Sequence, residues 1–251
     1  MISDFLKKRL AELLRRRGYK LHRIWVEGYT FEDALALALQ DVSGRAPFVI
    51  DIGAHKGDFF VPVLAKHPEA KIFAFEPIPD LAAALRARFA QTPSLVVIEA
   101  ATGEKAARVN FNVHSHVASS SILGVDKHYS ETYPDQARVS QKLSVEMTTV
   151  DDAMAAHSAD DGEVDILKID VQGFEGPALR GAERTLQRTT TVIVEAALLP
   201  TYEGGIMADE LCAMLRDRGF ELAYAFNVYA ASADLLFVRR RLSSKRTEHG
   251  R

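Results

Sequence analysis

The stretch from Phe48 to Gly57, which reads FVIDIGAHKG, constrains the fold of this chain more than any other part of the sequence. Apolar and β-prone residues lead into Asp51, and Gly53 then begins a turn that ends at Gly57, before the helix-compatible segment 58–66. The stretch therefore predicts a buried strand, a tight turn and the start of a helix. This layout is typical of a cofactor-binding crossover, because glycines let backbone N–H groups approach a ligand closely.

Segments with strand character alternate with segments of helical character along most of the chain. Short apolar runs, as expected for parallel strands buried on both faces, are followed by longer helical patterns. The further predicted strands are 71–78, 95–101, 165–170, 191–198, 221–227 and 234–239, and the predicted helices are 58–66, 80–91, 176–188 and 207–218. Repeated units of this kind predict an α/β fold with a Rossmann-like, mostly parallel sheet and helices on both faces.

Two segments in the middle of the chain alternate between apolar and polar residues, as half-exposed strands do. They are Ala107–His114 (ARVNFNVH) and Lys142–Val150 (KLSVEMTTV), and the stretch between them is polar and irregular. We predict an inserted β-hairpin or flap here, with a loop lying over the cofactor.

The two ends of the chain differ in charge from its middle. Residues 1–20 carry seven Lys or Arg against two acids, and residues 239–251 carry six against one, although the whole chain has a net charge of −3. We predict an N-terminal helical cap over 1–44, a catalytic domain over 45–240 and a basic, disordered tail over 241–251. The acidic middle argues against a nucleic-acid binder, because phosphate contacts need a basic groove.

The predicted cap contains two helices. Thr30, with Asp33 three residues on, predicts the N-terminus of a helix that runs to about Leu39. An earlier amphipathic helix ends near Gly18 and is surrounded by basic residues. We interpret its apolar face as packing on the domain, and the alternative is peripheral contact with an anionic membrane surface.

Composition favours a soluble, cytoplasmic protein. The chain has 251 residues, of which 47% are hydrophobic, so it can bury the core of a full domain. Cys212 is the single cysteine and cannot form an internal disulfide, which favours a reducing compartment. No apolar run approaches the roughly 18 residues that a membrane span needs, and the N-terminus lacks the apolar core of a signal peptide.

Acidic residues stand at the carboxyl ends of the predicted strands. Ligands of such sheets bind at these ends, near the point where the strand order reverses, so the acidic side chains should converge. Glu76 lies 23 residues after Gly53, about where an acid accepts the hydroxyls of a bound ribose. For Glu99 and Glu195, a helix cap or a solvated loop end is the alternative. The carboxylates of this predicted rim are Asp51, Glu76, Glu99, Asp170 and Glu195.

The acid before the glycine turn distinguishes between two adenosine cofactors. Asp51 would repel the pyrophosphate of a nicotinamide dinucleotide, whose pattern also requires a glycine where Ala54 or His55 stands. S-adenosylmethionine has no phosphate, and it carries a cationic sulfonium and an ammonium group. The acidic rim therefore favours S-adenosylmethionine, with a nicotinamide-dependent oxidoreductase as the alternative.

Several stretches of the chain resemble one known family, and the similarity spans residues 47–200. They are DIGAHKGDF at 51–59, FEPIPD at 75–80, the small polar loop around Ser119–Ser121, TTVDD at 148–152 and LKIDVQGFEGPALRGAERTL at 167–186. These stretches look like the FkbM family of S-adenosylmethionine-dependent methyltransferases. The resemblance implies the seven-stranded class I methyltransferase fold over the catalytic domain. It also implies O-methylation of a hydroxyl on a sugar, polyketide or other secondary metabolite.

The chemistry of methyl transfer indicates which residues to expect near the acceptor. Transfer from a sulfonium is an in-line displacement, so the protein mainly has to align the acceptor oxygen with the methyl carbon. We predict that Asp170 positions the methionine end or the acceptor hydroxyl, and a role as base is the alternative. His114 and His116 of the flap are candidate bases, with a solvated loop as the other interpretation. Lys168 should share a side of its strand with Asp170 and keep it ionised. Gln172 stands where many members of the family have Glu, and it is a poor choice of base.

The remaining site predictions concern the cofactor and a metal. We expect Glu175 to cap the helix that begins at Gly176. Asp170, Glu195 and the two flap histidines also offer ligands for a divalent metal, but no tight ligand spacing favours one. The predicted cofactor contacts are Asp51, Gly53, Ala54, Gly57, Glu76, Pro77, Glu99, Ala100, Ser120 and Asp170.

The predicted partner is a small-molecule or glycan substrate. Its contacts should come from the flap (103–147), the N-terminal cap and the segment 200–207, which includes Tyr202. We expect His55 and Lys56 to face solvent or the acceptor. A binding protein that keeps the methyltransferase fold without turnover is the remaining alternative.

Overall fold

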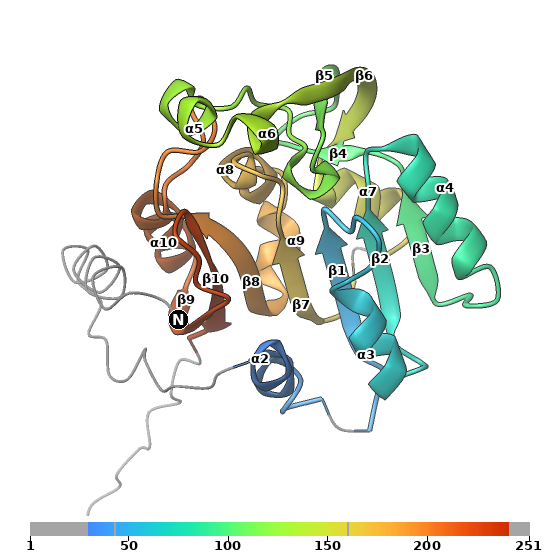
Figure 1. Ribbon diagram of the computed structural model, residues 1–251. Helices are drawn as coiled ribbons and strands as arrows, with labels where there is room; N and C mark the ends of the chain where they lie inside the picture. Colours follow the sequence, from blue (N-terminus) through green and yellow to red (C-terminus); the bar gives the residue numbers. More distant parts are fainter. Residues whose placement is uncertain (1–29, 43, 160, 241–251) are drawn as a thin grey trace, which may run out of the picture.

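The computed structural model describes residues 30–42, 44–159 and 161–240, and Figure 1 shows them arranged around a seven-stranded sheet. Neighbouring strands follow the order β3-β2-β1-β7-β8-β10-β9, and every strand except β10 runs in the same direction. The strands are β1 (Phe48–Ile52), β2 (Lys71–Phe75), β3 (Leu95–Ile98), β7 (Val164–Ile169), β8 (Thr189–Ala197), β9 (Phe220–Phe226) and β10 (Ser232–Arg239). The predicted, mostly parallel α/β sheet is confirmed.

The order in which strands are added reverses between β1 and β7. From β1 the chain adds β2 and β3 on one side, and it later returns to add β7 and β8 on the other side. Open α/β sheets bind ligands in the crevice at such a point, outside the carboxyl ends of the strands. The loops that follow Ile52 and Ile169 therefore frame the expected site.

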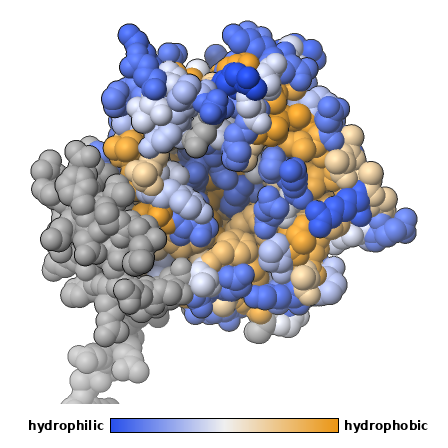
Figure 2. All heavy atoms as spheres, in the orientation of Figure 1, coloured by the Kyte–Doolittle hydropathy of each residue, from blue (hydrophilic) through white to orange (hydrophobic). Residues whose placement is uncertain are grey.

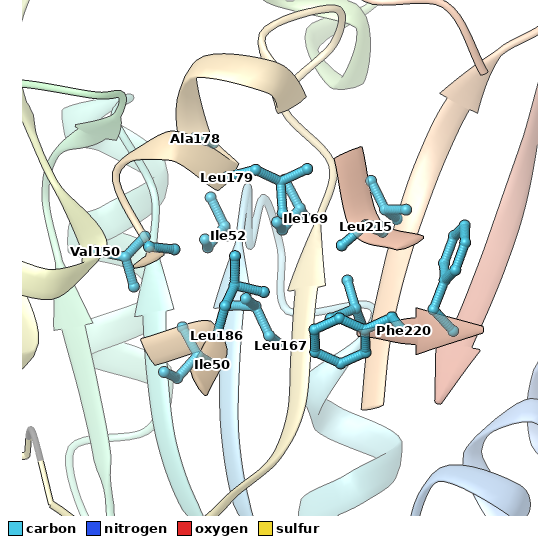
Figure 3. Packing of buried hydrophobic residues seen from close by; sticks show 14 of the residues in the cluster. Ile50, Ile52, Val150, Leu167, Ile169, Ala178, Leu179, Leu186, Leu215 and Phe220 are labelled. Atoms are coloured by element: carbon cyan, nitrogen blue, oxygen red, sulfur yellow. The ribbon is translucent and has the colours of Figure 1, made fainter. Parts of the chain in front are cut away.

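Helices cover both faces of the sheet (Figure 1). Side chains alternate along β1, so Val49 faces one helical layer, while Ile50 and Ile52 face the other and pack with Leu167 and Ile169 (Figure 3). The helices on the Val49 face are α2 (Phe31–Ala38), α3 (Phe60–Lys66) and α4 (Pro79–Arg88). Those on the other face are α7 (Val150–Ala156), α8 (Glu175–Arg180), α9 (Glu183–Gln187) and α10 (Ala208–Asp217).

Two helix predictions met different outcomes. The capping box at Thr30 is confirmed, because its Oγ1 accepts from the Asp33 N–H at 3.3 Å and the Asp33 carboxylate accepts from the Thr30 N–H at 2.9 Å. The prediction of one continuous helix over 176–188 is wrong. The helix is interrupted at Gly181, between α8 and α9. The Gly181 carbonyl accepts from the Asp151 N–H, and its Cα approaches the backbone of Gly103.

The strand predicted over 95–101 is also divided. β3 ends at Ile98, and Ala101–Thr102 form β4, which belongs to a second, three-stranded sheet. β3 is the edge strand of the main sheet and is half-buried along its length, so its continuous apolar run does not mark burial on both faces.

The second sheet forms the predicted flap over the carboxyl ends of the main sheet (Figure 1). Its strand order is β4-β6-β5, and β5 (Ala107–His114) pairs antiparallel with β6 (Val139–Thr148). Between these strands lie a short 3-10 helix η1 (Val117–Ser119), α5 (Lys127–Thr132) and α6 (Pro134–Ala137). Phe111, Val113, Val145 and Met147 give the flap a hydrophobic core of its own.

The predicted helix ending near Gly18 and the tail over 241–251 lie outside the described residues, so the division into cap, domain and tail stays a prediction. Within the described part, α2 packs on the sheet through Ala34, Leu35 and Ala38. Over the same ranges, none of the helices combines the length and the apolar character that a bilayer span requires.

Candidate active site

Two cavities lie side by side at the carboxyl ends of the strands. The first cavity has a volume of about 370 Å³ and is lined by the glycine turn and the ends of β1, β2 and β7. The second cavity has a volume of about 660 Å³ and is lined by the flap and by loops of 197–202 and 229–232. Asp170, Gln172 and Glu195 border both. Figure 2 shows this face of the molecule hollowed beneath the flap.

The glycine turn is fitted tightly between three strands. The N–H groups of Gly53 and Ala54 donate to the Phe75 carbonyl of β2 at 3.0 and 2.9 Å. Gly53 has a φ of +78°, and a Cβ there would lie 1.9 Å from the Asp170 carbonyl oxygen. Only glycine allows this approach, so the turn holds β1 and β7 close together at the first cavity.

Glu76 joins the end of β2 to the glycine turn. Its carboxylate accepts from the His55 N–H at 2.7 Å and from the Ile78 N–H at 2.8 Å. Burial raises the pKa of Glu76 to about 7, although these two hydrogen bonds oppose the shift. A carboxylate has about four acceptor positions. Glu76 therefore keeps acceptor capacity for hydroxyl groups in the first cavity, which it lines.

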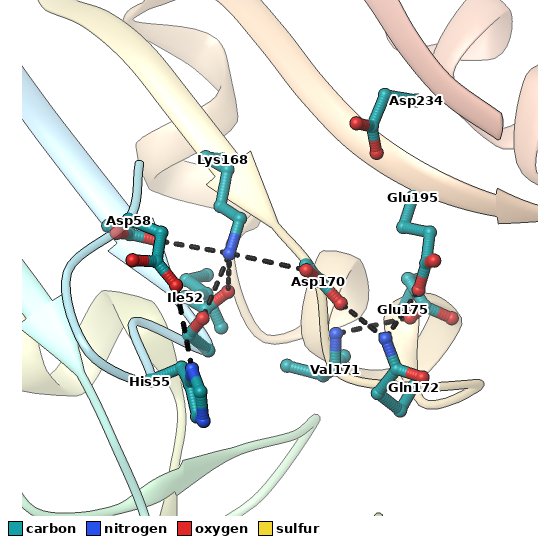
Figure 4. A network of polar contacts seen from close by, with 12 residues as sticks. Ile52, His55, Asp58, Lys168, Asp170, Val171, Gln172, Glu175, Glu195 and Asp234 are labelled. Carbon is teal, nitrogen blue, oxygen red and sulfur yellow. Dashed lines mark hydrogen bonds and ion pairs between the residues drawn. The ribbon is translucent and has the colours of Figure 1, made fainter. Parts of the chain in front are cut away.

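Asp51 lines neither cavity, and its role as a cofactor contact stays a prediction. Its side chain is completely buried and lies beside Lys168, its register partner on the adjacent strand β7. Lys168 Nζ lies 3.2 Å from Asp51 Oδ1, 3.6 Å from Asp170 Oδ2 and 2.9 Å from the Gly53 carbonyl oxygen (Figure 4). The predicted proximity of Lys168 to Asp170 is confirmed.

The electrostatics of this buried group support an ion pair. Burial by itself lowers the pKa of Lys168, but the charges of Asp51 and Asp170 outweigh it and raise the pKa above its ordinary value. Burial also raises the pKa of Asp51, and the Lys168 ammonium opposes that change. Neither Asp51 oxygen accepts a hydrogen bond of normal geometry from the described residues. The Lys168 charge therefore compensates the burial of Asp51.

Gln172 forms the wall between the two cavities. Its Nε2 donates to Asp170 Oδ1 at 2.7 Å and to Glu195 Oε2 at 2.5 Å (Figure 4). Its Oε1 accepts from the Tyr202 hydroxyl at 2.8 Å. Its φ is +55°, in the left-handed region that side chains other than glycine rarely occupy. Burial raises the pKa of Glu195, and nearby carboxylates, Asp170 foremost, add to the shift.

Glu175 supports the turn that carries Gln172, and the prediction that it caps the following helix is wrong. Helix α8 begins at Glu175 itself, with Phe174 at the N-cap position. The Oε1 atom of Glu175 accepts from the N–H groups of Val171 at 3.2 Å and Gly173 at 3.1 Å. Burial raises the pKa of Glu175 to about 7.

The two flap histidines differ in environment although both line the second cavity. His114 is 1% exposed, and neither of its ring nitrogens makes a hydrogen bond of normal geometry with the described residues. Burial lowers the pKa of His114, and the nearby Ser119 backbone opposes this shift. His116 is exposed, and its Nδ1 lies 3.1 Å from Ser119 Oγ. Burial therefore favours the neutral form of the His114 imidazole, whose two ring nitrogens are both buried.

Most of the predicted cofactor contacts meet in the first cavity. Asp51 and Gly57 are not part of its lining. Gly57 instead stabilises the turn, because its N–H donates to the Ala54 carbonyl at 2.7 Å. Glu99 is not in the lining, because β3 ends one residue earlier and the exposed carboxylate pairs with Arg86 at 2.7 Å. The predicted contacts that do line the first cavity are Gly53, Ala54, Glu76, Pro77, Ala100, Ser120 and Asp170.

The fold also brings to the first cavity several residues that the sequence patterns do not mark as cofactor contacts. Asp234 of β10 lies opposite Glu195 of β8 in the sheet register, and burial raises the pKa of Asp234 to about 6. Phe31 of α2 and Phe59 line the same cavity and meet edge to face, with ring centroids 5.6 Å apart. His55, which we expected to face solvent or the acceptor, lines the first cavity, while Lys56 is exposed. In the sequence, only its position directly before the apolar run LLFV could have indicated that Asp234 lies at the end of a buried strand.

No group of three or more His, Cys, Asp or Glu side chains within residues 30–42, 44–159 and 161–240 is arranged to hold a metal ion.

The strand order, with only β10 reversed, and the glycine turn beside strand-end acids define the class I methyltransferase fold. The model of the methyltransferase FkbM domain matches residues 51–222, so the chain belongs to the FkbM methyltransferase family. The predicted fold and family are thus confirmed, and the match favours a methyltransferase over an oxidoreductase.

Two curated relatives and one solved structure illustrate the similarity. Methyltransferase sdnD of Sordaria araneosa is 27% identical over 197 residues, which cover 70% of this chain and 74% of sdnD. 2-O-methyltransferase NoeI of Sinorhizobium fredii is 27% identical over 187 residues, which cover 72% of this chain and 74% of NoeI. The crystal structure of magnesium protoporphyrin IX methyltransferase from Synechocystis with bound SAM matches with a TM-score of 0.46 at 11% identity, covering 96% of this chain and 86% of that one.

Proposed function

We propose that the protein transfers a methyl group from S-adenosylmethionine to a hydroxyl oxygen of a small molecule that carries a sugar or polyol. The observation that carries this proposal is the pair of adjoining cavities, one for the donor and one for the acceptor, with Asp170, Gln172 and Glu195 between them. The name of one relative, 2-O-methyltransferase NoeI, supports oxygen as the acceptor atom.

The residues of the first cavity fit S-adenosylmethionine. The close approach at Gly53 brings the backbone to the ligand, and Glu76 offers acceptors for ribose hydroxyls. Asp170 offers negative charge to a cationic group, while the charge of Lys168 is offset by Asp51 beneath it. When bound, S-adenosylmethionine supplies a methyl group that is already activated by its sulfonium charge. The chain itself therefore has to position the acceptor oxygen and remove its proton.

We assign His114 as the base on the acceptor side. It lines the second cavity, and burial keeps its imidazole neutral and able to accept the hydroxyl proton on a ring nitrogen. Bound S-adenosylmethionine would give up its methyl group by breaking the methyl–sulfur bond and would leave as S-adenosylhomocysteine. His114 would take the proton that the acceptor hydroxyl loses as the carbon–oxygen bond forms. Asp170 borders both cavities and is suited to hold the acceptor hydroxyl in line.

Two experiments test this function. Isothermal titration calorimetry should show S-adenosylmethionine and its demethylated product S-adenosylhomocysteine binding the purified chain with micromolar affinity. A labelled methyl group should then pass to a hydroxyl in a pool of glycans and metabolites from the host. Failure to bind either compound, or tight binding of NADH in their place, would refute the proposal.

Two finer statements stay predictions. A cytoplasmic location rests on the single cysteine, Cys212, which the structure shows to be buried. Contact of the N-terminal amphipathic helix with an anionic membrane concerns residues that the structure does not describe.

A further inference from the structure

Two of the exposed large hydrophobic side chains of the described residues line the second cavity, and the others come from segments next to one or the other cavity. Tyr133 and Tyr229 line it and are 43% and 64% exposed. Leu199 is joined to the same region, because its N–H donates to the carbonyl of Ala231, which also lines the cavity. We call the set Val117, Tyr133, Val139, Leu199 and Tyr229 the apolar rim.

The two remaining members of the apolar rim lie on the flap, next to the proposed base. Val139 is the strand partner of His114, and Val117 begins the 3-10 helix that follows His116. The apolar rim therefore draws on the flap, the loop after β8 and the loop before β10, and its member Val117 also lines the first cavity. A contiguous exposed apolar surface bordered by polar residues is a common feature of binding sites.

The floor of the second cavity has the opposite character. It carries His114 and Asp170, together with the amide of Gln172 and the hydroxyl of Tyr202. A ligand that fills the cavity therefore meets polar groups at the floor and apolar groups at the mouth. The second cavity is also larger than the first, about 660 Å³ against about 370 Å³, although the first is assigned to the whole donor molecule.

From this gradient we infer that the acceptor is amphiphilic. Its polar part, with the reacting hydroxyl, occupies the floor, and a covalently attached hydrocarbon part lies on the apolar rim. The inference rests on the proposed function in one respect, because it takes the second cavity as the acceptor site. We identify the occupant by its position, because a molecule that presents its hydroxyl to His114 in the second cavity also reaches Tyr133 and Tyr229, which line the same cavity. Exposed tyrosines suit such a boundary, because they combine an apolar ring with a polar tip.

The test compares two soluble probes that share a polar head. Protein loaded with S-adenosylhomocysteine is titrated with methyl β-D-glucoside and with n-octyl β-D-glucoside, the latter below its micelle concentration. The octyl compound should bind at least about tenfold more tightly, because several of its methylene groups would leave water. Replacing Leu199→Ser and Tyr229→Ser together should remove this preference. The matched pair Leu199→Met and Tyr229→Phe should retain it.

The affinity for S-adenosylhomocysteine, measured on every variant, separates this inference from the proposed function. Equal binding of the two glucosides, or a preference that survives the double serine variant, would overturn the inference. Two further results would overturn it if the protein showed no preference for the octyl glucoside. One is binding to phosphatidylglycerol vesicles that the double serine variant loses, and the other is a dimer in sedimentation that the same variant loses. Loss of S-adenosylhomocysteine binding by the wild-type protein would refute the proposed function instead, and an octyl preference that persisted there would still support an amphiphile site.

Discussion

The ion pair between Asp51 and Lys168 leads to a prediction that separates a supporting role of Asp51 from direct cofactor contact. Asp51 is completely buried, and its Oδ1 lies 3.2 Å from Lys168 Nζ. Removing one partner of a buried pair leaves the other charge uncompensated, which costs about 3 to 5 kcal/mol. We therefore expect Lys168→Met to lose stability on that scale and Asp51→Asn to lose less, because Asp170 Oδ2 still lies 3.6 Å from Lys168 Nζ. The loss expected for Lys168→Met is a large fraction of the roughly 5 to 15 kcal/mol that stabilises a typical protein.

The double variant provides the decisive comparison. With both charges removed, no buried charge is left uncompensated, so the loss should fall short of the sum of the two single losses by about 1 to 3 kcal/mol. Lys168→Met also removes the hydrogen bond to the Gly53 carbonyl, and part of its cost should persist in the double variant. Urea unfolding followed by circular dichroism at pH 7 measures all four free energies of the cycle.

Two results would contradict this reasoning. Additive losses in the cycle would show that the two charges do not interact. A stable Asp51→Asn protein whose affinity for S-adenosylhomocysteine fell as far as that of Asp170→Asn would return Asp51 to the cofactor contacts that the sequence predicted. Calorimetry on the folded variants distinguishes these cases, because Asp170 lines the first cavity and Asp51 does not.

Three other predictions follow from the site. Gly53→Ala should abolish S-adenosylhomocysteine binding in calorimetry, because its Cβ would lie 1.9 Å from a carbonyl oxygen. Gly162 has a similar φ of +79°, but a Cβ there would meet no atom within 4 Å, so Gly162→Ala should bind normally. His114→Asn should lower kcat about 10²-fold or more without weakening S-adenosylhomocysteine binding, and His116→Asn should change kcat little; equal effects would refute the assignment. Burial raises the pKa of Glu175 from its ordinary value of 4.5 to about 7, so its stabilising contribution is full below pH 4.5 and is lost as the pH rises through 7. Glu175→Gln should flatten this loss, on the order of 3 kcal/mol, in urea unfolding at pH 5 and 7.5, and an unchanged slope would contradict the shift.

Features coded within a few residues could be predicted from the sequence. The run FVIDIGAHKG gives a strand, a turn and a helix start because buried apolar residues and glycines act locally. Glu76 and Asp170 were placed correctly at the first cavity, because the carboxyl ends of parallel strands converge in any such sheet. The capping box at Thr30 is local in the same way.

The positions of other acidic residues relative to the first cavity depend on strand register and on tertiary contacts. Asp51 lies within β1, whereas Asp170 follows β7, and its β-sheet register sets Asp51 beside Lys168, which lines the first cavity while Asp51 does not. Glu99 is absent from the lining of the first cavity because β3 is an edge strand that ends at Ile98, before the predicted end at residue 101. Asp234 reaches the first cavity only through the antiparallel pairing of β10 with β8, which no local pattern specifies.

Gln172 shows how such distant pairings can create the chemistry of the site. Its amide uses both N–H groups on two carboxylates, those of Asp170 and Glu195, and so joins the ends of β7 and β8 without adding charge. A carboxylate in its place could not donate to either partner unless it held a proton, since an ionised carboxylate only accepts hydrogen bonds. The neutral amide therefore holds Asp170 at the border of the two cavities, and in the proposed function we assign proton removal to His114.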